Sequence, residues 1–113
     1  MNGMSAVKVE YLDTKDALKR IGGNMDLYKL LLGQFIAEDH IRPIEEALGI
    51  GEMEEASRLA HSLKGVAANL SLIKLSATAG KLEYELKNGM QHPETFDDLK
   101  NDYCITSQQI AKI

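Results

Sequence analysis

The sequence is poor in the residues that support several classes of site. Its 113 residues include no tryptophan, two prolines and one cysteine, Cys104. A single cysteine excludes an internal disulfide framework and any zinc site built from several cysteines. Basic residues are outnumbered by acidic ones, and the net charge of −4 argues against nucleic acid as the main partner.

Long apolar runs are also missing. No stretch approaches the length needed to span a bilayer, so no membrane partner is expected. The start, Met1 to Ser5, is polar and lacks the apolar segment of a signal peptide, and the expected compartment is the cytoplasm. Repeats and low-complexity segments are absent as well. The length fits one domain. We expect an N-terminal arm over residues 1–12 and a single helical domain over residues 13–113.

Caps, glycines and apolar periodicity predict an all-α fold. Asp13 can cap a short helix that ends at Gly22-Gly23, and Asn24 can cap the next one. That second helix is expected to kink or break between Asp39 and Arg42, ahead of Pro43. The long helices are expected over about 25–48, 53–70, 72–88 and 95–112. With short connections they form an antiparallel up-down-up-down four-helix bundle, capped by the short first helix.

The third of these long helices has an apolar face and an outer face. The apolar positions recur at three- and four-residue spacing: Ala56, Leu59, Ala60, Leu63, Val66, Ala67 and Leu70. His61 falls almost opposite that stripe and is predicted to be exposed. Its expected neighbours on the outer face are Glu54, Ser57, Arg58, Lys64, Gly65 and Ala68.

Gly65 on this outer face needs an explanation, because glycine inside a helix is about 1 kcal/mol less favourable than alanine. One explanation is that the surface beside His61 is kept clear. Because Gly65 has no side chain and Ala68 has only a methyl group, a large partner can approach His61. Lys64 lies one turn along and can lean toward the same point. An exposed nucleophile beside a cation suits an imidazole that accepts and donates a phosphoryl group.

The run His61-Ser-Leu-Lys-Gly-Val-Ala-Ala-Asn-Leu70 resembles the signature of histidine-containing phosphotransfer (HPt) domains, the carriers of multistep phosphorelays. The resemblance continues through Leu75, Ala79 and Leu82-Glu83, and upstream through 17–24 and 30–35. Ser71 stands where that family usually places a glycine. The left-handed residue that ends the helix is therefore expected at Asn69 instead.

The resemblance implies a phosphoryl carrier. His61 would accept the group from an aspartate of a receiver domain, for example in a hybrid sensor histidine kinase, and pass it to another receiver. Lys64 would shield the charge, with Arg58 a weaker candidate, and Gly65 and Ala68 would give clearance. Mg²⁺ would belong to the receiver, with no cofactor on this chain. The family also implies a monomer, while the wide apolar set of the second helix leaves a dimer open. Gly22-Gly23 lacks the spacing of a nucleotide-binding glycine loop, so no kinase activity of its own is expected.

Three alternatives remain open from the sequence. Glu83 can hydrogen-bond the histidine, as the family suggests, or it can be a rim residue whose carboxylate reaches water. The chain can be a helical adaptor that binds a signalling partner through the His61 face without carrying phosphate. It can also be an acid–base enzyme, although this requires a concave pocket and a second titratable group beside His61.

Overall fold

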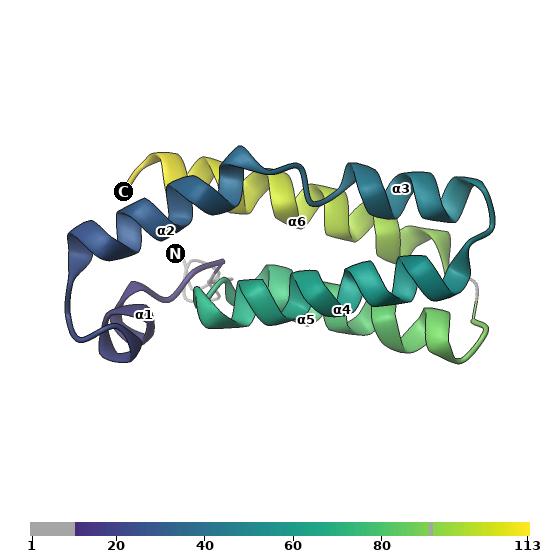
Figure 1. Cartoon of the computed structure of the whole chain (residues 1–113), viewed down its shortest axis with the longest axis horizontal. Helices are drawn as coiled ribbons and strands as arrows, with labels where there is room; N and C mark the ends of the chain where they lie inside the picture. Colours follow the sequence, from purple (N-terminus) through teal and green to yellow (C-terminus); the bar gives the residue numbers. More distant parts are fainter. Residues whose placement is uncertain (1–10, 91) are drawn as a thin grey trace, which may run out of the picture.

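The computed structural model describes residues 11–90 and 92–113, which form helices joined by short turns. The elements in order are α1 (Thr14–Arg20), α2 (Met25–Ala37), α3 (Arg42–Gly49), α4 (Met53–Asn69), α5 (Ile73–Lys87) and α6 (Pro93–Ala111). Figure 1 shows α2 and α3 following one another along one edge of the bundle, with α4, α5 and α6 alternating in direction. The predicted all-α antiparallel bundle with a short N-terminal helix is confirmed. The predicted arm, residues 1–12, falls almost entirely outside the described residues.

Local hydrogen bonds explain where the first helices begin and end. The Asp13 side chain accepts a hydrogen bond from the Asp16 N–H at 3.0 Å, and the Asn24 side chain accepts one from Leu27 N–H at 3.0 Å. Both are N-caps that satisfy otherwise unpaired amides. Gly22, at φ +73°, supplies the left-handed turn between α1 and α2.

The expected interruption of the second helix is a full break, which separates α2 from α3. Pro43 lies in the first turn of α3, where its missing N–H is of no consequence. The Asp39 carboxylate accepts hydrogen bonds from the amides of Ile41 and Arg42, both at 3.0 Å, and so starts α3. Before the break, the His40 ring stacks on Phe35 with centroids 4.4 Å apart. The break is thus built from side-chain contacts as well as from proline.

The core lies between α4 and its neighbours, and it corrects the predicted faces of this helix. Val66, expected in the apolar stripe, is exposed, whereas Ser57, expected on the outer face, is buried. The reason is that α4 packs most extensively on α5. This packing covers the side of α4 that carries Ser57 and leaves the side that carries Val66 open. Of the remaining stripe, Leu59 is half-buried against the core, and the burial of the others is confirmed: Ala56, Ala60, Leu63, Ala67 and Leu70.

The turn after α4 differs from the expectation for Asn69. Asn69 is the last residue of the helix, and Ser71 itself takes the left-handed conformation at φ +58°. Its hydroxyl donates to the Asp16 carboxylate at 2.7 Å, and its carbonyl accepts from the Asp13 N–H at 2.9 Å. These contacts tie the start of α1 to the α4–α5 turn and hold a non-glycine residue in a conformation that favours glycine.

Two substitutions at Ser71 separate the backbone effect from the hydroxyl contact. Both Ser71→Gly and Ser71→Ala remove the bond to Asp16, but only glycine adopts a positive φ without steric conflict. We therefore expect Ser71→Gly to be about 1 kcal/mol more stable than Ser71→Ala. Denaturant unfolding of the two variants measures this difference. Equal stability would mean that φ at this turn is not restrained in solution.

Candidate functional site

His61 stands on the open outer face of α4. Its side chain is 65% exposed, although the helix that carries it packs extensively against α5. Gly65 lies one turn later, and a Cβ placed there would meet no heavy atom within 4 Å. Ala68, another turn on, is also exposed. The imidazole therefore has free space along the helix, as the spacing predicted.

Glu83 of α5 reaches across to the imidazole. Its carboxylate is buried and lies 2.9 Å from His61 Nδ1. A carboxylate only accepts hydrogen bonds, so Nδ1 carries the proton and donates it. In the neutral ring the other nitrogen, Nε2, then keeps its lone pair. Of the two interpretations of Glu83, the geometry agrees with the hydrogen-bonding one and not with a side chain that reaches water.

Two lysines share the same carboxylate. Lys87 Nζ lies 2.8 Å from one Glu83 oxygen and Lys64 Nζ lies 3.1 Å from the other. Hydrogen bonds from Lys87, Lys64 and His61 lower the pKa of Glu83 to about 2, against the effect of burial. Glu83 is therefore ionised throughout the neutral range. Two ammonium groups against one carboxylate leave a local excess of positive charge around the Glu83–His61 pair.

Gly80 explains how Lys64 reaches Glu83. A Cβ at Gly80 would lie 3.0 Å from Lys64 Cδ, closer than side chains normally pack. The missing side chain gives the stem of Lys64 a path over α5, one turn before Glu83. The same lysine is anchored at its backbone, because its carbonyl accepts a hydrogen bond from the Ser76 hydroxyl at 3.2 Å. Gly80 on α5 thus allows the ammonium group of Lys64, which belongs to α4, to reach Glu83.

The remaining predicted site residue, Arg58, is turned elsewhere. It lines the same groove as His61, a surface hollow of about 520 Å³. Its guanidinium, however, forms a two-point ion pair with Glu55, with Nε–Oε1 and Nη2–Oε2 distances of 2.8 and 2.6 Å. The structure therefore brings His61, Lys64 and Glu83 together. The surface at Gly65 and Ala68 is left uncovered, and the guanidinium of Arg58 does not point at the imidazole.

Sequence reasoning missed Lys87 and misplaced Ser57. Lys87 follows Glu83 by one helical turn, and this i, i+4 acid–base spacing is a signal that could have found it. Ser57 borders the groove from a buried position, and its hydroxyl has no hydrogen-bond partner among the described residues. No periodicity argument could place it there, because its burial depends on how α4 is rotated against α5.

The part of the chain that the structure describes contains neither a metal-binding cluster nor a membrane-spanning helix. No group of three or more His, Cys, Asp or Glu side chains there is arranged to hold a metal ion. Within residues 11–90 and 92–113, none of the helices has the length and apolar character to cross a membrane.

Comparison with known proteins gives one match. The family model described as "Hpt domain" matches residues 31–107, which is most of the chain and includes α3, α4 and α5 entire. His61, Lys64, Glu83 and Lys87 all lie inside the matched region. No curated protein and no solved structure matches the chain.

Proposed function

The chain belongs to the Hpt domain family, and from that premise we propose that it carries a phosphoryl group on His61 between receiver domains. The group would come from the aspartyl phosphate of one receiver and leave to the aspartate of another. One observation carries the proposal: an exposed imidazole whose Nδ1 is held by a buried carboxylate at 2.9 Å, so that Nε2 faces the open surface.

The transfer step follows from that tautomer. The Nε2 lone pair attacks the phosphorus of the receiver's acyl phosphate, a P–N bond forms, and the P–O bond to the aspartate breaks. The aspartate leaves as a carboxylate. No proton has to leave Nε2, because the ring proton sits on Nδ1, and the positive charge that develops on the ring is stabilised by Glu83. Attack by the second receiver's carboxylate on phosphorus reverses these bond changes.

The lysines have the complementary role. The phosphoryl oxygens bring negative charge to Nε2, close to the Glu83 carboxylate, and this repulsion needs compensation. Lys64 and Lys87 supply two positive charges on side chains that are 41% and 63% exposed. Such side chains can turn from Glu83 toward the phosphoryl oxygens. Mg²⁺ belongs to the receiver in this proposal, and positioning with electrostatics supplies the catalytic assistance.

The direct test is a phosphoryl-transfer assay. The whole chain is mixed with a receiver domain that carries a labelled aspartyl phosphate, in the presence of Mg²⁺. We expect label to appear on the chain in a form that survives alkali and is lost in acid, as a phosphoramidate is. A second, unlabelled receiver should then remove it. Receivers that transfer to other Hpt domains but leave no label on this chain would contradict the proposal and favour the adaptor hypothesis.

Gly65 offers a test of the clearance argument with a matched control. Gly65→Gln places a side chain on the open face one turn from His61, whereas Gly33→Gln does the same on the exposed side of α2. Neither new Cβ meets a neighbour within 4 Å. Both variants should gain up to about 1 kcal/mol of stability, because glycine is the poorer helix former.

Only the change at Gly65 should slow transfer, by about tenfold, because the new side chain holds the receiver away from Nε2. Melting temperatures and transfer rates of the two variants give both quantities. Equal rates in the two variants would show that the space beside His61 is not used by the partner.

A further inference from the structure

Gly80 lies in the middle of α5, where no turn requires a glycine and where glycine is a poor helix former. Among the described residues, a Cβ at this position would meet only the stem of Lys64, with Cδ at 3.0 Å and Cγ at 3.8 Å. The missing side chain therefore makes room for one neighbour, the lysine that crosses from α4.

This path over α5 determines where the Lys64 ammonium group lies before transfer. Its Nζ is 3.1 Å from Glu83 Oε1, and the Glu83 side chain is buried. Lys87 reaches the same carboxylate from within α5 at i, i+4 spacing, so its contact needs no gap between two helices. Of the two lysines, Lys64 is the one whose contact with Glu83 depends on Gly80.

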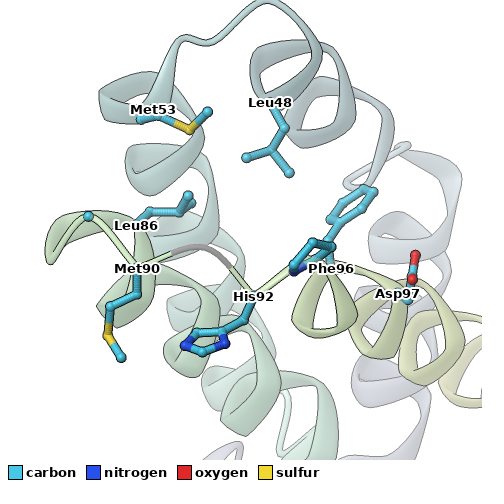
Figure 2. A pocket seen from close by; sticks show the side chains of 9 residues that line it. Leu48, Met53, Leu86, Met90, His92, Phe96 and Asp97 are labelled. Atoms are coloured by element: carbon cyan, nitrogen blue, oxygen red, sulfur yellow. The ribbon is translucent and has the colours of Figure 1, made fainter.

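Glu83 itself is held in place independently of Gly80. Figure 2 shows the side chain of Leu86, which follows Glu83 on α5, pointing into an apolar hollow at the end of the bundle that Met53 of α4 also lines. Leu86 packs against the core as well. This packing fixes α5 against α4 next to Glu83. A larger side chain at Gly80 is therefore expected to move the flexible stem of Lys64 and to leave Glu83 where it is.

Glu83 and a phosphoryl group on His61 compete for this lysine. Lys64 follows His61 by three residues on α4, so its ammonium group can reach Nε2 along its own helix without crossing α5. Glu83 lies against Nδ1, whereas the phosphoryl group is formed on Nε2, at the other side of the ring. An ammonium group that moves to the phosphoryl oxygens therefore has to leave Glu83.

We infer that Gly80 is a positioning residue that sets the equilibrium of phosphoryl transfer, because it lets Glu83 hold Lys64 in the unphosphorylated chain. The inference rests on the proposed function. Transfer forms the P–N bond at Nε2 and breaks the P–O bond to the receiver's aspartate. The Lys64–Glu83 contact exists before this step and is lost after it, so it favours the unphosphorylated chain. It thereby keeps the phosphoryl group easy to pass to the second receiver.

The test is the distribution of label at equilibrium between a labelled phosphoreceiver and the whole chain, in the presence of Mg²⁺. Gly80→Val places methyl groups on the path of Lys64 over α5 but leaves its route to Nε2 open. We expect it to raise the equilibrium constant for phosphoryl acceptance about fivefold. Gly80→Ala displaces the same stem less, so it should give a smaller rise, and it decides the matter if Gly80→Val does not fold.

Two controls show whether the effect passes through Lys64. Gly33→Val makes the same change on α2, where a new Cβ meets no heavy atom within 4 Å, and should leave the equilibrium constant unchanged. In a Lys64→Ala background the path over α5 is empty, so Gly80→Val should have no further effect on the equilibrium constant there. An effect of valine on α5 alone would persist without the lysine.

The remaining outcomes are decisive as well. If the original chain exchanges label and Gly80→Val leaves the equilibrium constant unchanged or lowers it, the inference is wrong, while the carrier function stands. If the rise persists in the Lys64→Ala background, Gly80 does not act through Lys64 and the inference is again wrong. If the original chain accepts no label at all, the proposed function fails, and the role of Gly80 fails with it.

Discussion

Replacing His61 with glutamine is expected to reduce phosphoryl acceptance by at least about 1,000-fold, to the background of the assay. Glutamine has nearly the reach of histidine but no ring nitrogen that can form the P–N bond. The imidazole is 65% exposed and packs into no core. The loss should therefore come without a change in fold, and the melting temperature should stay within a few degrees of the original.

The chain has three histidines, so the assignment needs a control. His92→Gln removes another exposed imidazole and should leave the acid-labile label unchanged. Receiver binding, measured by calorimetry or surface plasmon resonance, should persist in His61→Gln because the surrounding surface is intact. A His61→Gln chain that still accepts acid-labile label would place the phosphoryl group on another residue. If the original chain and His61→Gln both bind receivers and neither becomes labelled, the chain is an adaptor.

The position of His61 could be predicted because it depends on one helix. Apolar residues at helical spacing define the buried side of α4, and a residue opposite to them is exposed whatever packs on the buried side. The same holds for Gly65 and Ala68. The lysine at i+3 is likewise local, since its distance from His61 is fixed by helix geometry. Periodicity within one element was sufficient for this part of the site.

Glu83 could not be placed in this way. Its distance from His61 depends on the rotation and register of α5 against α4, which no pattern within either helix encodes. The same missing information explains the errors at Ser57 and Val66, because both lie at the edges of the apolar stripe, where a small rotation decides burial. At Ser71, the decisive contacts come from Asp13 and Asp16 of a distant segment. Those contacts hold the left-handed turn that a local rule had assigned to Asn69.

The second large effect is expected at Glu83 itself. Glu83→Gln keeps the size of the side chain but replaces the acceptor-only carboxylate with an amide that can present either oxygen or nitrogen to His61 Nδ1. The tautomer is then no longer fixed, and the developing charge on the ring loses its partner. Substituting the groups that orient metal-bound histidines typically costs 10- to 100-fold, and Glu83 orients His61 in the same way. We expect a decrease of that size in the transfer rate.

Glu85→Gln is the matched control, because Glu85 lies on the same helix and is buried to the same extent as Glu83. It should leave the transfer rate unchanged. Nitrogen-15 NMR of the ring should show a protonated Nδ1 and an unprotonated Nε2 in Glu85→Gln, and a mixture of tautomers in Glu83→Gln. Equal transfer rates in Glu83→Gln and Glu85→Gln would contradict this role. So would a single tautomer of His61 in Glu83→Gln. In either case Glu83 would have only a structural role.

The pH dependence of stability gives an independent measure of the same contacts. Burial tends to raise the pKa of Glu83, but hydrogen bonds from Lys87, Lys64 and His61 prevail and lower it from 4.5 to about 2. A lowered pKa means that the folded state favours the carboxylate, so its contribution is complete above the unfolded pKa and is lost as pH falls toward 2. The original chain should therefore be more stable than Glu83→Gln at pH 7, and this difference should shrink between about pH 5 and pH 2. The other carboxylates titrate in both proteins, so their contributions cancel in the comparison. A difference in the free energy of unfolding that does not change with pH would mean that the lysines and His61 do not bind the Glu83 carboxylate in solution.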